Sequence, residues 1–137
     1  MKTLNKALFL LVASGLIIFS SCKEDKKEDP KPEEISITIN TPEENATYGK
    51  NDTVFVTGSI EGPEELHGYM IEIINTSHSD SVVFEKHQHD HGTSFQIDEM
   101  WINNVSHHSD MQLKVTVYPG HEGDEKIETF HFHCHPM

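Results

Sequence analysis

Residues 111–118, MQLKVTVY, carry Leu113, Val115 and Val117 at every second position, with polar residues between them. Side chains two residues apart on a β-strand point to the same face, so this stretch predicts a strand with one apolar face. Six other short stretches alternate in the same way or are apolar, and turn residues separate them: EISITIN (34–40), DTVFVTGSI (52–60), LHGYMIEII (66–74), DSVVFEKHQH (80–89), TSFQIDEMWI (93–102) and KIETFHFHC (126–134). No window keeps a helical period. The seven candidate strands predict an all-β domain.

The stretch ITINTPEENATYGKNDTVFVTGSIEG (37–62) narrows this fold class. A strand that ends before a proline, then a turn and a valine-rich second strand, resembles the opening of bacterial immunoglobulin-like (Ig-like) modules. The resemblance extends loosely over residues 35–137 and includes YPGHEGDEK (118–126) as a hairpin loop before the last strand. It implies a single Ig-like β-sandwich domain over residues 35–137. It implies nothing about activity, because one fold hosts many functions.

The first 21 residues have the composition of a secretory signal peptide. Two lysines precede an apolar run over residues 7–19. That run of about 13 residues is well short of the roughly 20 that a membrane-spanning helix needs. The small residues Ser20 and Ser21 then precede Cys22, an ending that resembles the bacterial lipobox. The resemblance implies that Cys22 is lipidated and becomes the mature N-terminus; the alternative is an ordinary signal peptide with a spare thiol.

Residues 22–34 are predicted to be a flexible charged linker. The stretch KEDKKEDPKPEE (23–34) mixes both charge signs with two prolines and has no apolar residue, so it cannot bury enough surface to offset its ordering entropy. It resembles the charged leader of surface-displayed lipoproteins of the Bacteroidota, which implies an outer-membrane location facing outward. Lipidation of Cys22 would leave Cys134 alone, so no intramolecular disulfide is expected and the apolar core must suffice.

Charge and motifs exclude several functions. Residues 35–137 hold four lysines against seventeen acidic residues, and the chain has no arginine. A nucleic-acid reader needs a basic stripe, so no nucleic-acid partner is expected. The chain has no G-x-S-x-G, H-E-x-x-H or phosphate-binding glycine loop, so it is not expected to be an enzyme. An acidic surface instead attracts cations.

The C-terminal strand predicts a metal site. His131, His133 and His135 share one strand face, and a hairpin whose paired residue numbers sum to about 243 or 245 places His108 and Asp110 opposite them. Neutral imidazoles bind zinc or copper with bonds of about 2.0–2.1 Å and compete with protons near an ordinary pKa of about 6.5. These five residues are the predicted metal ligands, for Zn or Cu.

A second histidine group is predicted at the opposite end of the sandwich. It contains His67, His87, His89, His91 and His121, and we expect it to be a weaker, accessory metal site. Cys134 shares the parity of the inward-facing Phe132, so packing is expected; a frayed strand end would instead make its thiolate a metal ligand.

The alternative function is an adhesion or binding module that engages a protein or a glycan, with histidines that only tune charge. Exposed Trp101 and Tyr118 would favour this function, because aromatic side chains anchor partners. Separately, DTV at Asp52 and DSV at Asp80 resemble a short O-glycosylation signal of exported Bacteroidota proteins. That resemblance implies sugar on Thr53 and Ser81.

Overall fold

One very long strand organises the molecule. The computed structural model describes residues 33–120 and 124–137, and contains only strands and connecting loops in that part of the chain. The strands are β1 (Ser36–Thr41), β2 (Thr47–Tyr48), β3 (Thr53–Asn75), β4 (Ser81–Gln88), β5 (Gly92–Ile102), β6 (Ser109–Pro119) and β7 (Lys126–Cys134). The prediction of an all-β domain is confirmed. The predicted signal peptide, Cys22 and nearly all of the predicted linker lie outside the described residues.

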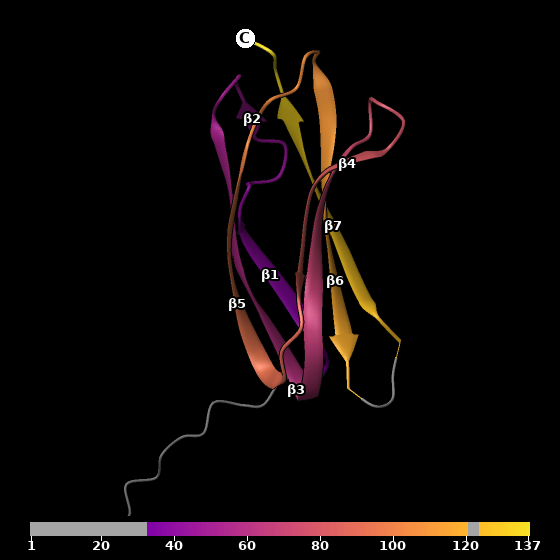
Figure 1. Cartoon of the computed structure of the whole chain (residues 1–137). Coiled ribbons are helices and arrows are strands. Elements are labelled where there is room, and N and C mark those ends of the chain that lie inside the picture. The colour runs from indigo at the N-terminus through magenta and orange to yellow at the C-terminus, as the bar shows by residue number, and fades with distance from the viewer. Residues whose placement is uncertain (1–32, 121–123) are drawn as a thin grey trace, which may run out of the picture.

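β3 belongs to both halves of a curled sheet (Figure 1). Its first half pairs antiparallel with β1 and β5, and its second half pairs antiparallel with β4 and β6. β7 continues the second half next to β6, and the short β2 lies parallel to β7 at the far edge. Both halves of the sheet therefore share one continuous strand, β3.

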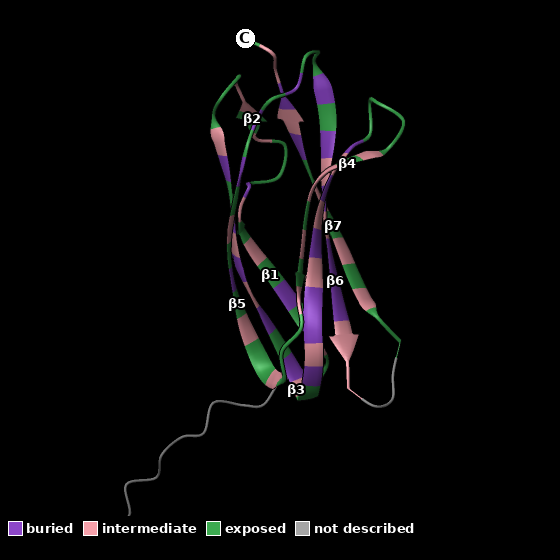
Figure 2. Ribbon diagram, in the orientation of Figure 1, coloured by how far each residue is buried: buried purple, intermediate pink, exposed green. Residues whose placement is uncertain are grey.

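The two halves of β3 face the same core. Val54, Val56 and Ile60 from the first half, and Ile71 and Ile73 from the second, have no exposed surface. They belong to one apolar cluster that every strand except β2 and β4 supplies with buried side chains, while the intervening residues of β3 remain partly exposed (Figure 2). Burying such side chains contributes about 1.5–3 kcal/mol each, so this cluster is the main stabilising feature.

The sequence predicted the inward faces correctly and one boundary wrongly. Leu113, Val115 and Val117 are fully buried, as their alternation indicates. The stretches 52–60 and 66–74, predicted as two strands, are one strand: the backbone stays extended past Pro63, while the pairing with β5 shifts between Glu61 and Leu66 and the pairing with β6 shifts between Leu66 and Tyr69. The turn residues between these two stretches bend the strand but do not end it. The two-residue β2 was not predicted.

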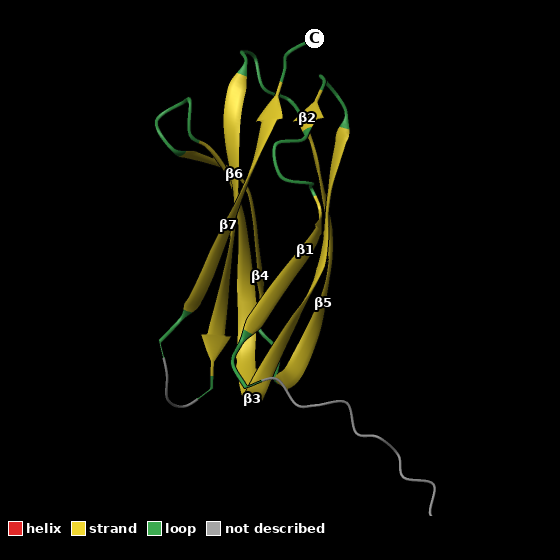
Figure 3. Ribbon diagram, turned by 180° about the vertical axis from the view of Figure 1, so that it is seen from behind, coloured by secondary structure: helices red, strands yellow, loops and turns green. Residues whose placement is uncertain are grey.

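The predicted hairpin register of the last two strands is confirmed in its first form. Asp110 pairs with His133 and Gln112 with His131, so the paired residue numbers sum to 243. Phe132 faces the core with no exposed surface, while the side chain of His131 is 53% exposed. The alternation therefore gives an apolar side and an imidazole side (Figure 3 shows β6 and β7 from behind).

A buried asparagine fastens the C-terminal end of the sheet. The Asn103 Nδ2 group lies 3.2, 2.8 and 3.1 Å from the carbonyl oxygens of Tyr48, Gly49 and His135, and Asn103 Oδ1 accepts the Val105 amide at 3.1 Å. One side chain thus joins three segments that are far apart in sequence.

In the part of the chain described, no helix is long and apolar enough to cross a membrane.

We predict that Asn103→Ala lowers the free energy of unfolding by about 2–4 kcal/mol, because buried carbonyl and amide groups lose their partner. Urea denaturation measures this change. The matched control is Asn104→Ala, since Asn104 is the exposed neighbour; its effect should stay within about 0.5 kcal/mol. Equal losses from both variants would contradict the assigned role of Asn103.

Candidate metal centre

The histidines gather at the two ends of the curled sheet, as the sequence predicts. One end contains the bend in β3 and the end of β4; the opposite end contains the start of β6 and the end of β7 (Figure 1). The predicted accessory residue His121 lies outside the described residues. Each end presents a different arrangement of imidazoles and carboxylates.

Glu65, His67 and His91 converge at the β3 bend. Glu65 Oε1 lies 3.4 Å from His91 Nδ1 and 3.8 Å from His67 Nε2. The two imidazole rings are 4.5 Å apart between centroids. One ligand atom from each residue falls within 4.8 Å of the other two. In the described residues, this is the one group of three histidine, cysteine or acidic side chains so arranged.

A close backbone approach brings the histidines of this end together. Gly68, next to His67, has a φ of +111°, and a Cβ there would collide with the carbonyl oxygen of Gln88 and lie 3.1 Å from His89 Cα. Only glycine allows the end of β4 to come so near β3. The loop after β4 then carries His89 and His91 beside the β3 bend. Conformation at Gly68 therefore positions the whole cluster.

We predict that Gly68→Ala lowers the free energy of unfolding by about 2–4 kcal/mol, because an L side chain both strains the positive φ and meets the Gln88 carbonyl. Urea denaturation measures the loss. Gly92→Ala is the matched control: a Cβ at Gly92 meets its nearest atom at 3.7 Å, an ordinary contact. A larger loss at Gly92 than at Gly68 would show that the close approach is not needed.

The cluster has the chemistry of an open zinc-type site. Two imidazole nitrogens and one carboxylate oxygen match the ligand sets of Zn²⁺, and imidazole also suits Cu²⁺. Ligands of a tetrahedral ion with bonds of about 2.0–2.1 Å lie about 3.3 Å apart, so ligand atoms that lie within 4.8 Å of one another must converge by up to about 1.5 Å. The side chains of Glu65 and His91 are 60% and 52% exposed and can make that adjustment, whereas that of His67 is only 25% exposed and holds its place.

The other predicted accessory histidines differ in position. The His89 ring lies 5.5 Å from the His91 ring, close enough to supply a fourth ligand after a rotamer change. The His87 ring instead lies against Tyr118, with centroids 5.7 Å apart. His89 therefore belongs to this end's cluster, and His87 is turned away from it.

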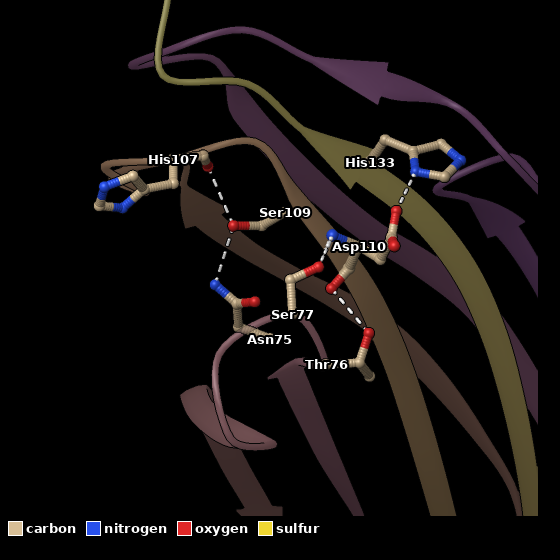
Figure 4. Close-up of polar contacts among 7 residues, drawn as sticks. All are labelled: Asn75, Thr76, Ser77, His107, Ser109, Asp110 and His133. Carbon is tan, nitrogen blue, oxygen red and sulfur yellow. Dashed lines mark hydrogen bonds and ion pairs between the residues drawn. The ribbon is translucent and has the colours of Figure 1, made fainter.

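The five metal ligands predicted around the C-terminal strand are assembled in pairs. We call this group the C-terminal strip; it contains His108, Asp110, His131, His133 and His135. His133 Nδ1 lies 2.9 Å from Asp110 Oδ1, and the rings of His108 and His135 are 4.4 Å apart (Figure 4 shows His133 with Asp110). His131 contacts different groups: Gln112 Nε2 at 3.4 Å and Glu44 Oε1 at 3.5 Å..

No three ligand atoms of this strip lie within 4.8 Å of one another in the described structure. The expected five-residue convergence is thus not formed. Each carboxylate or amide neighbour contacts a single histidine: Asp110 contacts His133, whereas Glu44 and Gln112 contact His131.

Cys134 packs into the core, as its parity predicts. The residue has no exposed surface, and burial, helped by the nearby Asp52 carboxylate, raises the pKa of its thiol to about 12. A thiol with that pKa remains protonated at neutral pH, whereas metal ligation needs the thiolate. Cys134 is therefore a packing residue in this structure.

Glu65 and Glu44 were missed by the sequence analysis. Glu65 and His67 are two apart in β3, the same spacing that drew attention to the C-terminal strip, so E-x-H in residues 65–67 was a usable signal. Glu44 precedes β2 and meets β7 only through the fold, and no sequence signal indicates it. The predicted glycosylation residues Thr53 and Ser81 each begin a strand and are half-buried.

Comparison with known proteins adds no family to these observations. Neither the protein-family models nor the curated protein sequences contain a match to the chain. The basis for a function is therefore the cluster of Glu65, His67 and His91 itself.

Proposed function

We propose that this chain is a lipid-anchored protein of the outer membrane whose Ig-like β-sandwich binds a divalent transition metal ion, Zn²⁺ or Cu²⁺, through Glu65, His67 and His91. The observation that carries the proposal is the convergence of these three ligand atoms within 4.8 Å. A metal-capturing protein at a cell surface needs an accessible site with imidazole ligands, and this cluster is accessible. No catalytic role is proposed.

The strand pairing supports an Ig-like sandwich. β1, the first half of β3 and β5 would form one layer, and β4, the second half of β3, β6 and β7 the other. These groups correspond to strands A, B and E, and to C′, C, F and G, of the Ig arrangement. β2 would be a short edge segment beside G.

Burial weakens the alternative of an adhesion module built on aromatic side chains. Trp101 is only 8% exposed and belongs to the core, so it cannot serve as a platform for a partner. Tyr118 is half-buried against the His87 ring. The aromatic surface that would have favoured adhesion is therefore absent at these two positions, and metal binding is the better supported function.

We predict that the purified protein binds Zn²⁺ with one principal site, measured by titration calorimetry. His67→Ala and His91→Ala should each lower the affinity by roughly tenfold or more, because water replaces a lost imidazole poorly. Binding should weaken steeply between about pH 7 and pH 5, since ligation requires neutral imidazole and protons compete for it.

The matched control is His87→Ala, which removes an exposed histidine of the same end that is turned toward Tyr118. It should change the affinity by less than about twofold. A double variant at the other end, His131→Ala with His133→Ala, shows how much of the Zn²⁺ affinity comes from that end. Equal losses from every histidine variant, or affinity no tighter than about 1 mM, would mean that the histidines are only a solvated surface.

The lipid anchor is tested separately in the native host. We predict that Cys22→Ala abolishes incorporation of radiolabelled palmitate and releases the protein from the membrane fraction, because the thiol at this position is the only attachment point in the proposal. Cys134→Ser is the control and should leave labelling unchanged. Palmitate incorporation that persists in Cys22→Ala would contradict the anchor.

A further inference from the structure

An open pocket lies at the end of the sheet opposite the metal cluster. It has a volume of about 420 Å³ and lies between the loop that joins β3 to β4 and the segment that leads into β6. Asn75 and Ser77 line it on one side, and His107 lines it on the other. The volume falls within the range of about 300–1,000 Å³ that small-molecule sites occupy.

The pocket lining is polar but uncharged. Its eleven described residues include serines, asparagines and histidines, and none is aspartate, glutamate or lysine. Charged residues make up 24% of the chain, so a lining without one differs from the composition of the chain as a whole. Such a lining provides hydrogen-bond donors and acceptors without a fixed charge, which favours a neutral ligand rich in hydroxyl groups.

A buried side chain at the pocket keeps an unused hydrogen-bond acceptor. The Asn75 residue is 7% exposed, and its Nδ2 donates to Ser109 Oγ at 3.0 Å. Ser109 Oγ in turn donates to the His107 carbonyl at 3.0 Å (Figure 4). Because that hydroxyl proton is committed, Ser109 can only accept from Asn75, and the amide orientation is fixed. Asn75 Oδ1 then has no partner in the described structure, but the atom itself is buried, so Asn75 supports the wall of the pocket and is not a contact for a ligand.

The loop beside Asn75 is held in place and offers a donor. Ser77 Oγ accepts the Asp110 amide at 2.9 Å, which leaves the Ser77 hydroxyl proton free to donate. Thr76 Oγ1 donates to the Asp110 carbonyl at 2.9 Å, so two side-chain bonds attach the loop to β6 (Figure 4). The Thr76 amide also donates to that carbonyl at 2.9 Å. A ligand hydroxyl in the pocket can accept from Ser77.

We infer that this pocket binds a neutral carbohydrate. Sugar hydroxyls act as both donors and acceptors, which matches the free Ser77 proton and the other polar side chains of the lining, His78 included. Val83 and Val105 also line the pocket and provide apolar contacts for the C–H faces of a sugar ring. The site lies at the opposite end from the metal cluster, and the inference does not depend on the proposed metal binding.

The experiment is a titration of the ¹⁵N-labelled protein with neutral methyl glycosides of glucose, galactose, mannose and N-acetylglucosamine, followed by ¹H–¹⁵N correlation spectra. EDTA is present throughout, so that metal binding plays no part. At least one glycoside should shift resonances of residues 75–83 and 104–109 in a saturable manner. Glucuronate and glucose 6-phosphate, tested in parallel, should bind more weakly because the lining offers no fixed positive charge.

Two variants and a control test the assigned contacts. Ser77→Ala should weaken binding by about tenfold, the effect of losing one neutral hydrogen bond of about 1.4 kcal/mol. Because Ser77 also accepts the Asp110 amide, its variant is checked by thermal melting; His78→Ala, at an exposed loop position, should also weaken binding and leaves the core intact. His87→Ala, at the opposite end, should have no effect.

Three results would overturn the inference. The first is the absence of saturable shifts with every neutral glycoside up to about 20 mM, a concentration well above the dissociation constants of weak sugar sites. The second is binding that His87→Ala weakens as much as His78→Ala does. The third is tighter binding of the two charged sugars than of the neutral ones.

Discussion

The continuity of β3 is the constraint on which the rest of the structure depends. Twenty-three residues of extended backbone supply hydrogen-bond partners to four other strands, and no other strand pairs with as many. Since both halves of the sheet share this strand, the faces that bury Val56 and Ile71 cannot shift independently of each other. The apolar core follows from that connection, and so does the relation between the two ends of the molecule.

The bend within β3 also explains why a cluster forms there. Pairing with β5 slips between Glu61 and Leu66, so the side chains that follow the slip are no longer held in a flat sheet. Glu65 and His67 come directly from this region, and the close approach at Gly68 brings β4 against it. An irregularity that costs some backbone pairing thus positions acidic and imidazole groups at one point.

Alternation in the sequence was enough to predict every described strand except β2, although β3 was predicted as two strands, and also the inward faces and the register of the last hairpin. Those features depend on period and on loop length, which are local properties. The convergence of histidines was not predictable in the same way. It depends on how near Gln88 approaches Gly68, on whether side chains from different strands point together, and on loop shapes near Glu44. For this reason the C-terminal strip, which has the strongest sequence pattern, is assembled only in pairs, while the less regular group at the β3 bend brings three ligand atoms together.

The direction in which the chain enters the sheet gives the two ends different surroundings. Ser36, at the start of β1, pairs with Glu61, so the chain enters at the β3 bend, and the C-terminal residues lie at the opposite end (Figure 1). With the proposed anchor at Cys22, the thirteen residues up to Glu34 can span at most about 45 Å. The metal cluster would then lie at the end of the domain nearer the membrane, and a membrane surface that carries anionic lipids concentrates cations. The uncharged pocket would point away from the bilayer, toward the extracellular medium.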